Sequence, residues 1–166
     1  MRIYGVLLAG LLLAGCGESD VQTRARQALA IEQGDECHLC GMVISRFPGP
    51  KGEAYEQGAE DVRKFCSTRD LLNWALEPEN RHARQEMWVH DMSEVPWGQP
   101  DDEHFIQAET AWYVVGSSQT GAMGPTLASF GDRAVADAFA GHYGGEVLAF
   151  EQLTLDKLNK NAHGTH

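Results

Sequence analysis

The hydrophobic and polar positions along the chain predict a first set of short elements between residues 42 and 92. Apolar runs predict strands over 42–44 and 59–65, and alternating positions predict a strand over 85–92. Between the last two strands, Ser67 stands three residues before Asp70, the spacing of a helix N-cap, and leucines follow at helical spacing. The predicted order is therefore strand, strand, helix, strand.

The second half of the chain repeats this order. Apolar runs predict strands over 111–115 and 126–130, separated by a glycine-rich loop over 121–125. Asp132 is placed to cap a second helix, and a strand over 146–153 closes the pattern. Together the two halves predict an α+β fold of two similar ββαβ units packed together, each with its helix on one face of a small sheet.

A polar stretch rich in Pro and Asp over residues 97–104 is the expected boundary between the units. Residues 17–33 are polar, with only a weak helical pattern, and are expected to form a flexible tether. The predicted organisation is a signal peptide over 1–15, a lipidated tether over 16–34, units over 35–96 and 97–155, and a tail over 156–166.

The N-terminus has the pattern of a secretory signal. Arg2 precedes an apolar run over 3–13, and Leu-Ala-Gly stands directly before Cys16. The run is shorter than the roughly 20 residues of a membrane-spanning helix. The ending resembles a bacterial lipobox and predicts that Cys16 becomes the lipid-modified first residue of an exported, periplasmic protein; the alternative is an ordinary signal with a chance cysteine. Gly17, rather than aspartate, follows the cysteine and favours the outer over the inner membrane.

Charge narrows the choice of partners. The chain carries a formal net charge of −11 and has no cluster of Lys and Arg, so nucleic-acid binding is not expected. The same acidity argues against docking by a basic patch on anionic lipid, which leaves Cys16 as the expected link to a membrane.

Residues 35–42 hold the strongest chemical signal. Cys37, His38, Cys40 and Met42 offer two thiols, an imidazole and a thioether, and Gly41 lets the backbone bend beside them. Soft sulfur ligands favour copper(I) over cations that prefer oxygen. A Cys-x-x-Cys spacing also fits a disulfide or a redox pair, because spacing alone does not separate these roles.

Further candidate ligands lie elsewhere in the chain. Cys66, just before the helix capped by Ser67, is a third ligand, a reactive thiol or a small buried side chain. Met123 lies between glycines in a loop, where it is either a ligand from the second half or a surface methionine. His38 is an accessory ligand candidate, and zinc held by the three thiols and a histidine is an alternative to copper.

The signal ending, the motif over 35–42, the repeated ββαβ pattern and the loop around Met123 together resemble the NosL family, lipoprotein accessory factors of nitrous oxide reductase. The resemblance implies a copper(I) chaperone that helps to assemble the copper centres of that enzyme. It implies two partners, the reductase and an ABC-type maturation complex in the inner membrane. It also implies that Cys40, Met42 and Met123 are metal ligands, with Cys37 matching the motif and Cys66 and His38 as spare ligands.

Two other functions compete with the chaperone. The first is a thiol–disulfide oxidoreductase that uses Cys37 and Cys40; such a motif normally opens a helix, whereas here a strand is predicted to follow it. The second is a scaffold lipoprotein with an inert disulfide. No nucleophilic triad, phosphate-binding loop or carboxylate pair stands out, so the chain is not expected to be an enzyme.

Overall fold

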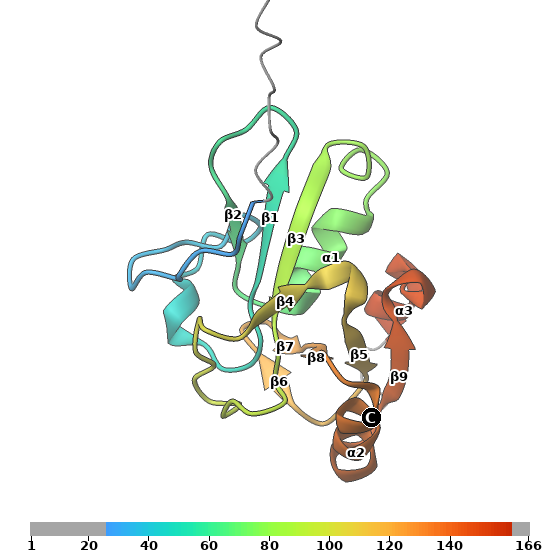
Figure 1. Cartoon of the computed structure of the whole chain (residues 1–166). Helices are drawn as coiled ribbons and strands as arrows, with labels where there is room; N and C mark the ends of the chain where they lie inside the picture. Colours follow the sequence, from blue (N-terminus) through green and yellow to red (C-terminus); the bar gives the residue numbers. More distant parts are fainter. Residues whose placement is uncertain (1–25, 161–166) are drawn as a thin grey trace, which may run out of the picture.

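The computed structural model describes residues 26–160, and the predicted signal peptide and Cys16 lie outside the described residues. The fold is α+β, as predicted. The first sheet is antiparallel, with strand order β2-β1-β3-β4. Its strands are β1 (Gly52–Glu56), β2 (Arg63–Phe65), β3 (Arg84–His90) and β4 (Phe105–Gln107). Helix α1 (Thr68–Leu76) packs on one face of this sheet (Figure 1).

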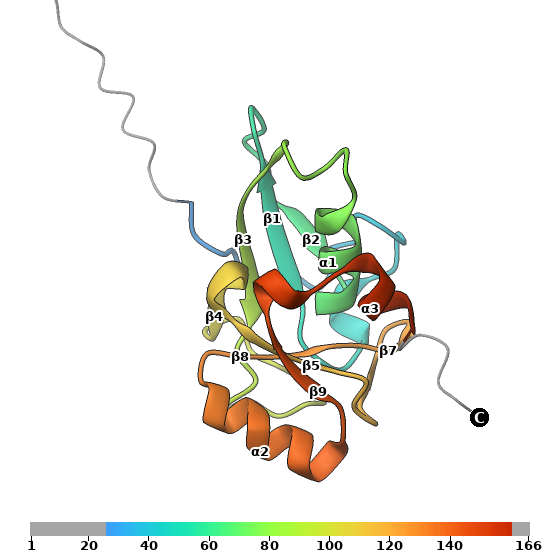
Figure 2. The ribbon, with the colours of Figure 1, turned by 90° about the vertical axis from the view of Figure 1, so that its right-hand side faces the viewer.

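The second sheet has the order β8-β5-β9 and is also antiparallel. Its strands are β5 (Trp112–Val115), β8 (Ala128–Phe130) and β9 (Glu146–Ala149), and helix α2 (Arg133–Tyr143) packs against them (Figure 2). In both sheets the first strand of the unit is central, the second lies on one side, and the strand after the helix lies on the other. A ββαβ arrangement thus occurs twice with one strand order.

Short elements connect these units. The β6–β7 hairpin (Thr120–Gly121 and Gly124–Pro125) lies within the predicted glycine-rich loop. Single turns of 3-10 helix, η1 (Ile44–Arg46), η2 (Ala108–Thr110) and η3 (Phe150–Gln152), precede or follow strands. Helix α3 (Leu155–Lys160) occupies residues expected to belong to a tail, because Leu158 is buried against the core that includes α1.

The prediction and the structure differ at two strands and one boundary. The strand expected over 42–44 is reduced to a single bridge between Val43 and Glu36, after which η1 turns Ile44 into the core. The strand β1 was not predicted, since it contains Gly52 and two glutamates and follows a stretch rich in glycine and proline. Strand β4 lies beyond the predicted boundary at residue 97 but pairs with β3, so that boundary does not separate the two sheets.

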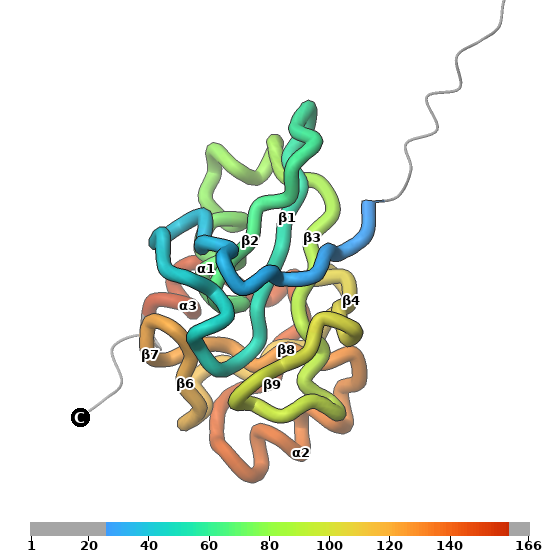
Figure 3. Tube along the Cα trace, turned by 90° about the vertical axis from the view of Figure 1, so that its left-hand side faces the viewer, coloured from blue at the N-terminus to red at the C-terminus, as the bar shows by residue number. Residues whose placement is uncertain are grey.

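The segment predicted as tether is shorter than expected. Residues 26–33, the N-terminal strap, lie across the face of β1 opposite α1 (Figure 3). The backbone N–H of Leu29 donates to Glu53 Oε2 at 2.8 Å, and Tyr55 Oη donates to the carbonyl of Gln27 at 2.9 Å. The N–H of Ile31 donates to Asp102 at 3.0 Å. Ordered hydrogen bonds therefore begin well before the predicted first unit.

Helix α2 offers a direct test of local sequence control. The side chain of Asp132 accepts hydrogen bonds from the N–H groups of Ala134 and Val135, and Gly144, at φ 76°, ends the helix. Asp132→Ala is expected to lower the free energy of unfolding by about 1 kcal/mol, the usual value of an N-cap. Urea unfolding measures this. Asp137→Ala, which removes an exposed carboxylate in the same helix, is the control and should change stability by less than about 0.5 kcal/mol; equal losses would contradict the cap.

Candidate metal centre

A tight turn presents the Cys-x-x-Cys motif. The bridge between Glu36 and Val43 closes the turn, and the N–H of Cys37 donates to the carbonyl of Met42 at 2.9 Å. The N–H of Gly41 donates to the carbonyl of Cys37 at 2.8 Å. Gly41 has φ 71°, a backbone conformation that is strained for residues with a side chain. The turn buries Cys37 and exposes Cys40.

The start of α1 supplies the second half of the cluster. The Ser67 hydroxyl accepts from the N–H of Asp70 at 3.0 Å and thereby caps the helix, as predicted. Cys66 lies directly before the cap residue Ser67, and Asp70 lies four residues later in the first turn of α1. The Cys66 thiol donates to Asp70 Oδ2 at 2.9 Å, and both residues are buried.

The two segments meet in one group of ligand atoms. The sulfur atoms of Cys37, Cys40 and Cys66 and a carboxylate oxygen of Asp70 all lie within 4.8 Å of one another. The Sγ atoms of Cys40 and Cys66 are 3.5 Å apart, and all three cysteines are free thiols. Three sulfurs around one point are suited to a soft metal ion.

The pKa values of the three thiols and of the Asp70 carboxyl are shifted in different directions. Contact with the neighbouring Cys66 thiol, joined by hydrogen bonds from backbone N–H groups, lowers the pKa of Cys37. That same contact, then burial and the nearby Asp70 carboxylate, raises the pKa of Cys66. Burial raises the pKa of Cys40 and of Asp70. Among the three thiols, the first negative charge therefore resides on Cys37, and a metal cation would displace protons from Cys40 and Cys66.

The sequence had singled out Cys66 without favouring it, and it had given Asp70 no chemical role. Asp70 was noted only for the capping pattern that begins at Ser67. The signal that could have found the pair is Cys66-Ser67-x-x-Asp70, where a capped helix start fixes a thiol and a carboxylate one turn apart.

The other predicted ligands lie in different settings. The half-buried Met42 packs against the hydrophobic core. The ring of His38 faces Phe65 and Trp74 edge-on, with centroids 5.8 and 6.2 Å away, and one of its nitrogens pairs with Arg63. His38 is thus absent from the group that contains the three thiols.

Met123 occupies the turn of the β6–β7 hairpin and is 58% exposed. A hydrogen bond of 3.1 Å from Arg69 to the carbonyl of Pro125 ties the base of this hairpin to the first turn of α1, next to Asp70. The second half of the chain is therefore attached to the helix end that carries part of the cluster.

The Cys-x-x-Cys motif does not open a helix. It lies in a turn that leads into a single β-bridge and η1, whereas α1 begins 28 residues after Cys40, at Thr68. The arrangement that a dithiol oxidoreductase normally uses is therefore missing at this motif. Within residues 26–160, none of the helices is both long and apolar enough to cross a membrane.

Known sequences match almost the whole chain. The NosL family model matches residues 28–158. The copper-binding lipoprotein NosL of Stutzerimonas stutzeri is 48% identical over 165 residues, which cover 98% of this chain and 86% of that protein. The copper-binding lipoprotein NosL of Achromobacter cycloclastes is 34% identical over 157 residues, covering 93% and 80%.

Solved structures agree with these sequence matches. The crystal structure of the copper chaperone NosL from Shewanella denitrificans has a TM-score of 0.77 and 55% identity, and the match covers 78% of this chain and 97% of that one. The solution structure of apo-NosL from Achromobacter cycloclastes has a TM-score of 0.51 and 34% identity, with coverage of 65% and 88%. The chain therefore belongs to the NosL family.

Proposed function

We propose that this protein is a periplasmic copper(I) chaperone that holds the ion at the thiol cluster and passes it on without catalysing a reaction. The observation that carries the proposal is the meeting of three free thiols, one of them exposed, within 4.8 Å. The names of the relatives, copper-binding lipoprotein and copper chaperone, support the choice of metal. Copper(I) is the oxidation state that thiolates favour.

Exposure of Cys40 suggests how the ion leaves. Cys37 and Cys66 are buried and would bind the ion on the protein side. Cys40 is exposed and would bind it on the solvent side, from which a recipient ligand approaches. Copper(I) moves by ligand exchange: a sulfur or nitrogen of the recipient binds before Cys40 releases the ion. On loading, Cys66 loses its proton, and the Asp70 carboxylate at 2.9 Å is the nearest acceptor.

Met42 and Met123 fit this scheme as weak, exchangeable ligands. Met42 follows Cys40 within the same turn, and Met123 is exposed on a hairpin tied to the start of α1. Their thioethers would enter and leave the coordination sphere more easily than a thiolate. We do not include His38 in the ligand set, because its ring faces Phe65 and Trp74.

The recipient we propose is apo-nitrous oxide reductase, whose copper centres would be assembled with an ABC-type maturation complex in the inner membrane. The family supports this assignment, and lipidation of Cys16 would keep the chaperone at a membrane surface, preferably the outer one. Delivery is tested with copper-loaded protein and apo-reductase: the absorption bands of the reductase should develop with loaded parent protein and fail to develop with loaded Cys40→Ala.

The metal and its ligands have a separate test. Anaerobic titration of the reduced protein with copper(I), in competition with a chromophoric chelator, should give one ion per chain and an absorption edge with sulfur ligands. Cys40→Ala should weaken binding by at least about tenfold, since a thiolate ligand is lost. Parent-like affinity in this variant would contradict the site. Insulin reduction without copper, the property of a Cys37–Cys40 oxidoreductase, should be absent.

A further inference from the structure

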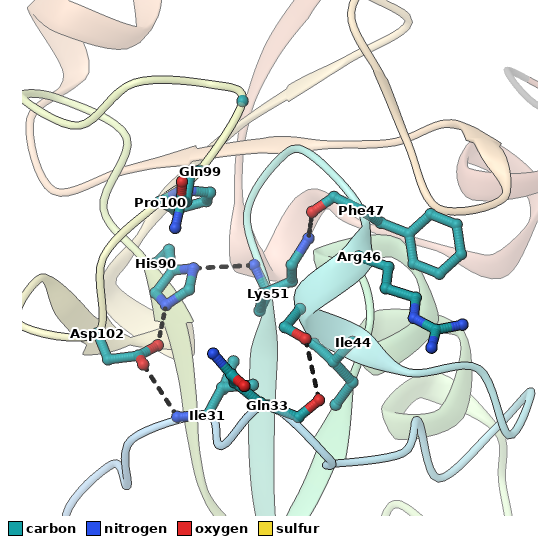
Figure 4. A pocket seen from close by; sticks show the side chains of 12 residues that line it. Ile31, Gln33, Ile44, Arg46, Phe47, Lys51, His90, Gln99, Pro100 and Asp102 are labelled. Carbon is teal, nitrogen blue, oxygen red and sulfur yellow. Dashed lines mark hydrogen bonds and ion pairs between the residues drawn. The ribbon is translucent and has the colours of Figure 1, made fainter.

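A second concave site lies apart from the thiols, where the N-terminal strap meets η1, the start of β1, the end of β3 and the loop before β4. Its volume is about 490 Å³, within the range of small-molecule pockets. Figure 4 shows side chains from all of these segments around it. The three thiols do not line this pocket.

Hydrogen bonds form a closed ring around the pocket. On one side, Ile31 N–H donates to Asp102 Oδ2 at 3.0 Å, and Asp102 Oδ1 lies 3.2 Å from His90 Nε2 (Figure 4). His90 Nδ1 accepts from the backbone N–H of Lys51 at 3.2 Å. The pocket wall on this side is thus fixed through the strap, the loop, β3 and the entry to β1.

The other side completes the ring. Lys51 Nζ donates to the carbonyls of Phe47 at 2.7 Å and Pro48 at 3.0 Å, and Ser45 Oγ donates to the carbonyl of Gln33 at 3.2 Å. Gln33 belongs to the same strap as Ile31, where the ring began. Because every segment is tied to the next, the pocket is preformed and its ligand need not order the walls.

The hydrogen bonds around the pocket leave positively charged groups available to a ligand. Burial lowers the pKa of His90 to about 4, so this side chain is neutral and both of its nitrogens are occupied within the ring. Both carboxylate oxygens of Asp102 are also engaged. Lys51 uses two of its three ammonium hydrogens, and in the described part of the chain the guanidinium of Arg46, on the exposed rim, has no partner. Asp102 contributes one negative charge, and Lys51 and Arg46 contribute two positive charges. The lining of the pocket therefore has a net charge of +1, although the whole chain has a formal net charge of −11.

We propose that this pocket binds a small organic carboxylate, with its charged group at Lys51 Nζ and the Arg46 guanidinium at the rim. Charge-assisted hydrogen bonds to a buried ammonium and a guanidinium are among the strongest that a carboxylate can accept. The side-chain amides of Gln33 and Gln99, which also line the pocket, supply further donors to the rest of the ligand.

Calorimetric titration of the copper-free, reduced protein with citrate as the probe tests the proposal. We expect saturable binding with one site per chain. Arg46→Gln should weaken it at least about fivefold, because one charge-assisted contact is lost, and Lys51→Met should abolish it. Arg133→Gln removes the same charge from the exposed surface of α2 and should leave the affinity unchanged.

Two further measurements locate the ligand and define its class. Citrate should slow hydrogen exchange of the amides at 31–33, 44–47, 98–99 and 101–102. Cys40→Ala should bind citrate as the parent does, which separates this pocket from the proposed copper site. Equal affinities of Arg46→Gln and Arg133→Gln would overturn the proposal even if Lys51→Met does not fold. Binding of inorganic phosphate in place of citrate would overturn the assignment to carboxylates.

Discussion

Replacing Cys66 with serine is expected to lower the affinity for copper(I) by at least about a hundredfold. Loss of a partner in the outer shell of a metal site already costs 10- to 100-fold, and Cys66 supplies one of the three sulfurs directly. Its Sγ lies 3.5 Å from that of Cys40 and is fully buried, so no solvent ligand replaces it in the same place. Competition with a chromophoric copper(I) chelator under anaerobic conditions measures the change.

His38→Gln is the matched control for this experiment. His38 lies inside the Cys-x-x-Cys motif, but its ring faces Phe65 and Trp74, outside the sulfur cluster. Its affinity for copper(I) should remain within about twofold of the parent value. If Cys66→Ser bound as tightly as His38→Gln, the buried thiol would not be a ligand, and the site would have to be rebuilt around the motif over 35–42 alone.

These two residues also illustrate what a sequence can and cannot predict about a site. The motif over 35–42 was recognisable because its ligands are neighbours in the chain. Whether a side chain within the motif faces the metal depends on the course of the turn, and the turn directs His38 toward aromatic rings of β2 and α1. Local spacing places Cys66 and Asp70 four residues apart, but only the packing of distant segments brings this pair to the motif over 35–42.

The same distinction applies to the fold. Helices α1 and α2 were predicted, because Ser67 and Asp132 mark their starts with capping side chains that act locally, whereas α3 was not. Strand β1 was missed because its residues are not typical of an inner strand. Glu53, in particular, is a fully buried carboxylate in a strand that lies between β2 and β3. The strap supplies a partner for one of its oxygens, since Leu29 N–H donates to Glu53 Oε2 from residues that were expected to be flexible.

The burial of Glu53 has a cost that depends on pH. Burial raises its pKa from an ordinary 4.5 to about 7; Asp102 and Asp35 add to the increase, while Leu29 N–H and Lys64 oppose it. The carboxyl therefore binds its proton more tightly in the folded than in the unfolded chain. The resulting stability is fully present below pH 4.5 and is lost as pH rises through about 7, by roughly 3 kcal/mol in total.

Glu53→Gln should remove this dependence, because an amide is neutral throughout the range. Relative to the parent, the free energy of unfolding of the variant should therefore rise by about 3 kcal/mol between pH 4.5 and pH 8. Urea unfolding of the copper-free, reduced proteins at several pH values measures the difference. Glu60→Gln, in an exposed loop, is the control and should keep a constant difference from the parent. Parallel curves for Glu53→Gln and the parent would mean that Glu53 has the same pKa in the folded and the unfolded chain, and burial in the sheet would then not disfavour its charge.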